Sequence, residues 1–222
     1  GTLTKGLLGV QGRPPKKDEA ERVSEMKDII FEGFLSAKEQ GIQGGDPAIL
    51  VDEQFGLQVQ EKAKEQGIKF AAPVEKSGQK VFDFEYGENF GEKINEVGAD
   101  FIKVLVRWNP DDEKEVRETQ GNRIKILSDW IEESDKKFLL EFLVPATEEQ
   151  LSGVDGDQLR YDTEIRPKLA VKVVEEMREK GADPDIWKIE GLDTPEKCIN
   201  VSKVIKSGDR EEVIAVVLGR GA

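Results

Sequence analysis

The feature that most constrains this chain is a series of short apolar runs separated by helix-like stretches. The runs cover residues 48–52, 69–74, 101–107, 137–144, 185–190 and 213–218. Each run is nearly continuous in apolar residues, which is typical of strands that are covered on both faces. The alternation predicts an α/β fold in which six parallel strands are flanked by helices.

The stretches between the runs predict the helices and loops. Helices are expected from Pro14-Pro15 to Gly41, over 57–66, 88–97 and 112–134, up to Gly181, and over about 194–207. Residues 1–13 and 146–163 are expected to be loops. No Gly-x-Gly-x-x-Gly follows the first run and no P-loop occurs, so a dinucleotide-binding or P-loop fold is disfavoured. A (β/α)8 TIM barrel is the preferred architecture, and its functional side chains come from the C-terminal ends of several strands.

Charged side chains fall inside the predicted strands, where they are unusual. Because side chains alternate between the two faces of a strand, Lys188 and Glu190 share one face, and so do Lys103 and Arg107. The polar positions found in this way are Asp52, Gln54, Lys103, Arg107, Glu141, Lys188 and Glu190. Charges that four strands direct into one interior predict a site.

Lys188 is the candidate nucleophile of that site. Burying an ammonium group in a core strand is costly unless the group is paired or reactive. A desolvated lysine loses proton affinity, and its neutral amine is a nucleophile. Lys103 would favour the neutral amine of Lys188 by like-charge repulsion, and Glu141 could transfer protons.

Structural explanations stay open for several of these residues. Lys188 could extend from a strand end or form a structural pair with Glu190. Arg107 and Glu190 could equally be supporting or strand-end charges. Three further strand-end charges are expected to be solvated: Glu53, Glu75 and Lys76.

Composition excludes several classes of function. The net charge of −13 argues against nucleic acid and anionic membranes as partners. The chain has no histidine, which excludes the usual hydrolase triads and histidine-based zinc sites. Cys198 is the only cysteine, which favours a reducing cytoplasm, and neither a signal peptide nor a bilayer-crossing segment is expected from the sequence.

The C-terminal residues Gly219, Arg220 and Gly221 end the last predicted strand. Backbone N–H groups and a cation at such a place could hold a phosphate group, although Gly-Arg-Gly alone is a common sequence. Gly219 and Arg220 are therefore candidate substrate-binding residues, and a surface role for them stays open.

Six segments together resemble one enzyme family. They are ILVDEQFG (49–56), PVEKSG (73–78), KVLVRWNP (103–110), LLEFLVPAT (139–147), DIWKIEGLD (185–193) and VLGRGA (217–222). The resemblance is to the aldolase-like domain that often follows a PfkB-type sugar kinase in myo-inositol catabolism proteins. That domain is similar to the class I tagatose-1,6-bisphosphate aldolases.

The resemblance implies a lyase that forms a Schiff base. Lys188 would be the Schiff-base lysine, Glu141 the catalytic acid and base, and Lys103 a second active-site lysine. Neither a metal nor another cofactor is implied, because the iminium is itself the electron sink. The implied fold is one barrel domain over residues 1–222 that supplies the second to seventh strands, with one strand before Gly1 and one after Ala222.

The implied substrate is 2-deoxy-5-keto-D-gluconate 6-phosphate, which would be cleaved to dihydroxyacetone phosphate and malonate semialdehyde. Its anionic ends would need cations, with Arg220 for the phosphate and Arg107, Lys76 or Arg166 for the carboxylate. The alternatives are an aldolase for tagatose bisphosphate or a sulfo-sugar phosphate, and a non-catalytic sugar-phosphate-binding or kinase-associated module. A homo-oligomer and a fused or associated sugar kinase are both compatible with the sequence.

Overall fold

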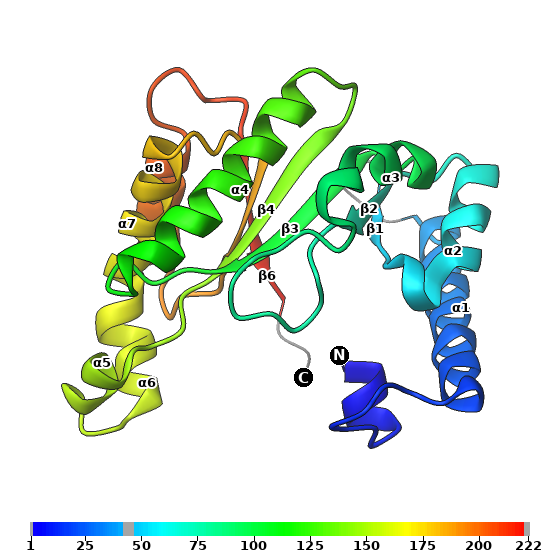
Figure 1. The fold of residues 1–222 in the computed structure, drawn as a ribbon, viewed down its shortest axis with the longest axis horizontal. Coiled ribbons are helices and arrows are strands. Elements are labelled where there is room, and N and C mark those ends of the chain that lie inside the picture. The colour runs from blue at the N-terminus through cyan, green and yellow to red at the C-terminus, as the bar shows by residue number, and fades with distance from the viewer. Residues whose placement is uncertain (1, 42–46, 220–222) are drawn as a thin grey trace. The chain divides into compact units, whose positions relative to one another are not determined.

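The computed structural model describes residues 2–41 and 47–219, and contacts within the chain group it into two compact units. The N-terminal unit is Gly1–Pro73 and the C-terminal unit is Val74–Ala222. Helices alternate with parallel strands in both units, so the predicted α/β class is confirmed (Figure 1). None of the helices in the described ranges is both long enough and apolar enough to cross a membrane.

The N-terminal unit consists of helices and one short pair of strands. Its elements are η1 (Thr2–Leu7), α1 (Lys17–Glu39), β1 (Ile49–Leu50), α2 (Glu53–Glu65) and β2 (Phe70–Pro73). Strands β1 and β2 pair in parallel, with Ile49 opposite Phe70. The loop predicted for residues 1–13 is wrong over its first part, because residues 2–7 form a π-helical turn.

The C-terminal unit carries the other four strands. Its elements are η2 (Gly87–Asn89), α3 (Phe90–Val97), β3 (Phe101–Arg107), α4 (Lys114–Glu132), β4 (Lys137–Leu143), α5 (Glu148–Ser152), α6 (Gln158–Arg160), η3 (Tyr161–Ile165), α7 (Arg166–Glu179), β5 (Ile186–Glu190), α8 (Pro195–Ile205) and β6 (Ile214–Leu218). The polar loop predicted over 146–163 is wrong in part. Thr147 caps α5 by accepting a hydrogen bond from the Gln150 backbone N–H, and Asp157 caps α6 in the same way.

Strands β3 to β6 pair in sequence order, all in parallel. One of their two faces, which we call the covered face, is fully buried along β3, β4 and β5: Ile102, Val104, Val106, Phe138, Leu140, Phe142, Trp187 and Ile189 are each at most 3% exposed. On β6 the same face carries Val217, which lies opposite Ile189 and is 53% exposed. Helices α4, α7 and α8 gather beside these strands (Figure 1). Burial of each large apolar side chain there contributes about 1.5–3 kcal/mol to folding, so this packing fixes the strand register.

The opposite face of β3 to β6, which we call the charged face, is less well covered. Lys103, Leu105 and Arg107 of β3 point to it, and only Lys103 among them is fully buried. Leu105 lies opposite Glu141, and Glu141 lies opposite Lys188. Since facing residues in parallel register point the same way, three neighbouring strands present charged side chains on one surface.

The prediction of an eight-stranded TIM barrel is wrong. The described residues contain six strands, two in the N-terminal unit and four in the C-terminal unit, and among them β6 pairs on one side only, with β5. Closing a barrel requires the last strand to pair with the first, which leaves no free edge. Strand β6 instead has Ile214 and Val217 about half exposed, at 51% and 53%. The fold is therefore α/β with an open sheet.

Candidate active site

Four charged side chains of the C-terminal unit meet beside the charged face. Lys103 comes from β3, Glu141 from β4 and Lys188 from β5. Glu75 follows β2, in a segment that forms an isolated antiparallel bridge with Phe84. We call Glu75, Lys103, Glu141 and Lys188 the charge cluster. The three residues predicted as catalytic are thus all present in it.

The four side chains form a chain of alternating charge. The Lys103 Nζ donates to Glu75 Oε1 at 2.5 Å and lies 3.5 Å from Glu141 Oε2. The Lys188 Nζ lies 3.3 Å from Glu141 Oε1. Glu141 therefore faces a different ammonium group with each of its two oxygens.

Burial makes these contacts strong. The side chains of Lys103, Glu141 and Glu75 are 8%, 6% and 13% exposed, whereas that of Lys188 is 20% exposed. Charges removed from water must be compensated by partners, so no member of the cluster can be deleted without affecting the others. Lys188 is the most exposed of the four side chains.

Glu75 is only partly compensated. Burial is the largest influence on its carboxyl group and raises its pKa, while the positive charge of Lys103 opposes that rise. Its second oxygen, Oε2, is buried and has no hydrogen-bond partner among the described residues. In the folded protein, the negative charge of Glu75 therefore costs stability.

This raised pKa predicts how stability depends on pH. A carboxyl group that holds its proton more tightly in the folded state stabilises the fold below its unfolded-state pKa, and this contribution is lost as pH rises through the folded-state pKa. The unfolding free energy of the wild type minus that of Glu75→Gln should therefore fall as pH rises above the ordinary glutamate pKa of 4.5. Urea denaturation between about pH 3 and about pH 8 measures this difference.

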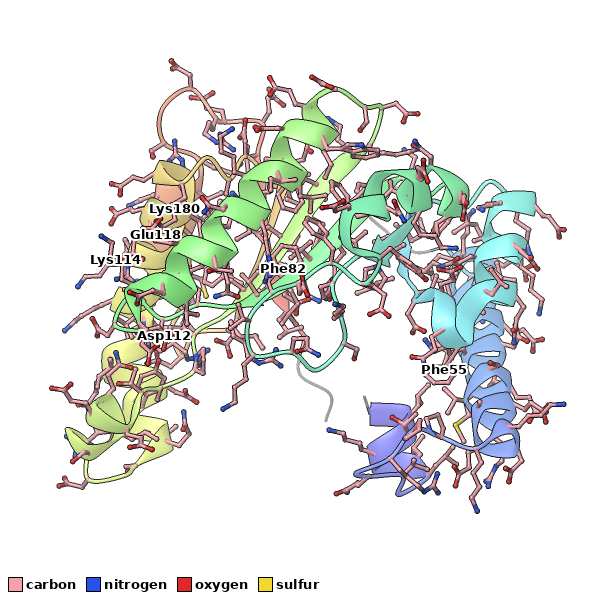
Figure 2. The ribbon with its side chains drawn as sticks, in the orientation of Figure 1. Phe55, Phe82, Asp112, Lys114, Glu118 and Lys180 are labelled. Atoms are coloured by element: carbon pink, nitrogen blue, oxygen red, sulfur yellow. The ribbon has the colours of Figure 1, made fainter. Side chains whose placement is uncertain are left out.

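Glu118 supplies a control of opposite sign. Figure 2 labels Glu118 and Lys180, which form an ion pair of 2.7 Å on the surface. This ion pair lowers the pKa of Glu118, so its contribution is present above the unfolded-state pKa of 4.5 and is lost as pH falls. If the difference in unfolding free energy between wild type and variant changed with pH in the same direction for Glu75→Gln and Glu118→Gln, the pKa of Glu75 would not be raised by burial.

Arg107 and Glu190 lie at the C-terminal ends of their strands on the charged face. The Arg107 Nη1 donates to the backbone oxygen of Gln79 at 2.9 Å, and within the described ranges Arg107 has no carboxylate partner. Glu190 Oε2 accepts a hydrogen bond from the Val144 N–H, and Oε1 lies 3.2 Å from the buried Arg166. Arg107 thus keeps donors for a ligand, whereas Glu190 makes the supporting ion pair that the sequence left open.

The remaining predicted residues lie elsewhere. The strand argument for Asp52 and Gln54 is wrong, because β1 ends at Leu50. Asp52 caps α2 by accepting from the Phe55 N–H and pairs with Lys27, and Gln54 is exposed in the first turn of α2. Both residues belong to the N-terminal unit. Gly219 is exposed after β6, and Arg220 lies outside the described residues.

Glu75 is the member of the cluster that sequence reasoning missed. It was expected to be solvated because it follows a strand end, yet it is buried against Lys103. The only signal was a glutamate directly after an apolar run, and that pattern fits many exposed residues equally well. Within the described residues, no three histidine, cysteine, aspartate or glutamate side chains gather as a metal site.

A comparison with known protein families finds a match. The model of the family described as "uncharacterized protein conserved in bacteria (DUF2090)" matches residues 14–222, which include the whole charge cluster. A comparison with curated proteins found no match.

Proposed function

The chain belongs to the DUF2090 family, and we propose that it is a class I aldolase, a lyase that cleaves a carbon–carbon bond of a phosphorylated keto compound through a Schiff base. One observation carries this proposal: the amine of Lys188, the most exposed side chain of the cluster, lies 3.3 Å from a buried carboxylate that a second lysine also contacts. A nucleophile beside a proton acceptor is the arrangement that imine formation needs. The single cysteine of the chain is consistent with action in the cytoplasm.

The first half of the reaction forms the iminium. The Lys188 ammonium passes a proton to Glu141, and the neutral amine adds to the ketone carbon of the substrate. The amine nitrogen loses a second proton and the former carbonyl oxygen gains one, which gives a carbinolamine. Glu141 then returns its proton to that hydroxyl group, which leaves as water, and the iminium remains on Lys188.

The second half breaks the carbon–carbon bond. Glu141, again a carboxylate, accepts the proton of the hydroxyl group on the carbon next to the scissile bond. The bond electrons move into the iminium, which becomes an enamine, and an aldehyde leaves. Protonation and hydrolysis of the enamine then free Lys188 and the second product. Lys103 supplies a positive charge beside Glu141 throughout.

The proposed substrate is 2-deoxy-5-keto-D-gluconate 6-phosphate, with dihydroxyacetone phosphate and malonate semialdehyde as products. Arg107 supports an anionic substrate, because it is two residues beyond the level of Glu141 and Lys188 on the same face. That offset is about 7 Å along the strands. An anionic group of the substrate that lies several bonds from the reacting ketone would reach Arg107.

The experiment that tests the proposal is reductive trapping. Incubation with dihydroxyacetone phosphate and borohydride should attach the mass of the reduced adduct to Lys188, as read by peptide mass spectrometry. An adduct on Lys103 would overturn the assignment of the nucleophile. No adduct at all would favour the alternative, a non-catalytic sugar-phosphate-binding module that has the same ion pairs.

Arg107 gives a prediction about substrate choice. Arg107→Ala should lower kcat/KM for the keto-acid phosphate by about ten- to a hundred-fold, because a lost charge-assisted hydrogen bond costs about 1.5–3 kcal/mol. Steady-state kinetics with this substrate and with tagatose 1,6-bisphosphate measures the effect. Arg210→Ala is the control, since Arg210 pairs with Asp183 at the other end of the strands. An unchanged value for Arg107→Ala, or a preference for the bisphosphate, would reassign the substrate.

A further inference from the structure

The two glutamates of the charge cluster have different surroundings. Glu141 lies between two lysines, whereas among the described residues the ion pair of Glu75 is with Lys103 alone. Building on the proposed aldolase reaction, we infer that Glu75 is a positioning residue. It holds Lys103 on the Oε2 side of Glu141 and neutralises part of the positive charge of Lys103. Oε1 of Glu141 is then free to exchange protons with Lys188 and the substrate.

The distances carry the first step of this argument. Lys103 is 2.5 Å from Glu75 and 3.5 Å from Glu141, so its ammonium group is held mainly by Glu75. At 3.5 Å from Glu141, the Lys103 ammonium stabilises the Glu141 carboxylate but does not form a close hydrogen bond with it. If Glu75 carried no charge, Lys103 would turn to Glu141 as its sole counter-ion. Glu141 would then be a weaker base, because a closer opposite charge favours the ionised carboxylate.

The second step separates positioning from ordinary structural support. A glutamate retained to satisfy a buried lysine should itself be satisfied, yet the buried Oε2 of Glu75 has no hydrogen-bond partner among the described residues. Removing its charge should therefore cost little stability. A group that is costly to the fold and adjacent to reacting groups is typical of functional sites.

The expected consequence is a split between two steps of the reaction. In Glu75→Gln, the amide keeps the size of the side chain and an acceptor for Lys103 but removes the charge. Lys188 keeps its own contact with Glu141, so the imine should still form. Proton abstraction by Glu141 should slow, since it depends on the basicity of that carboxylate. Substrate affinity should not fall, because the site becomes more positive.

Dihydroxyacetone phosphate is a probe that reports both steps. Borohydride trapping reports the imine, and deuterium incorporation from D2O into the carbon next to the carbonyl, followed by NMR, reports proton abstraction. In Glu75→Gln, trapping at Lys188 should stay within about twofold of wild type, while the exchange rate falls about tenfold or more. Glu75→Asp, which keeps the charge, should recover part of the exchange. Glu118→Gln, which removes a surface Glu–Lys pair, should exchange at the wild-type rate.

The outcomes separate this inference from the proposed function. If the wild type gives no adduct at Lys188, both are overturned. If the wild type gives an adduct and exchanges deuterium while Glu75→Gln exchanges equally fast, only the role of Glu75 is overturned. Parallel losses of trapping, exchange and melting temperature in both Glu75 variants would show a structural residue. Slow exchange with trapping and melting temperature preserved supports the positioning role.

Discussion

Replacing Lys188 with methionine should abolish imine trapping and lower kcat/KM by about 10⁴-fold or more, a loss of about 5.5 kcal/mol of transition-state stabilisation. Methionine keeps a flexible chain of similar length but has no amine, so no covalent intermediate can form. Glu141 would keep Lys103 as its partner at 3.5 Å, and the variant should fold. Steady-state kinetics, borohydride trapping and thermal unfolding of the same preparation measure the three expectations.

Lys137→Met is the matched control for that experiment. Lys137 begins strand β4, is largely exposed and pairs with Asp185 at 2.7 Å. It lies at the N-terminal end of β4, whereas Arg107 lies at the C-terminal end of the neighbouring strand β3. It should keep wild-type activity, because it is a strand lysine outside the cluster. Residual turnover of Lys188→Met within about tenfold of wild type would contradict a covalent mechanism at this lysine.

The strands of the C-terminal unit could be predicted from the sequence because their signal is strong and local. Strand β3 was predicted over 101–107 and is found at Phe101–Arg107, and β4 and β5 differ from prediction by one residue or less. Alternation along these strands also placed Lys103, Glu141 and Lys188 on one face. The apolar runs of β3, β4 and β5 are buried on the covered face, and this requirement fixes both the strand and its register.

The failures have physical causes as well. A period-of-two pattern over 48–54 cannot distinguish a strand from a two-residue strand followed by a helix cap, and Asp52 is a good capping residue. Barrel closure depends on pairing between distant strands, which no local pattern encodes. The burial of Glu75 depends on a bridge to Phe84 and on Lys103, which is 28 residues away.

Glu141→Gln should remove the proton-transfer group while the amine of Lys188 stays in place. Glutamine keeps the shape of the side chain and an oxygen for one lysine, but it cannot accept and return a proton. Deuterium exchange into dihydroxyacetone phosphate should fall by about 10²- to 10⁴-fold. Stability should fall too, by about 2 kcal/mol, because Lys188 loses its counter-ion. This is less than the 3–5 kcal/mol typical of a broken buried pair, since Lys188 is 20% exposed.

The contrast between the two glutamates is the sharpest consequence of this cluster. Glu141 satisfies two ammonium groups, so removing its charge should cost both activity and stability. Glu75 is buried with one oxygen unsatisfied, so removing its charge should cost activity while stability at neutral pH is kept or increased. Urea unfolding and deuterium exchange on Glu141→Gln, Glu75→Gln and the surface control Glu118→Gln measure the pattern. Equal stability losses in Glu141→Gln and Glu75→Gln would mean that the cluster is a structural ion-pair network.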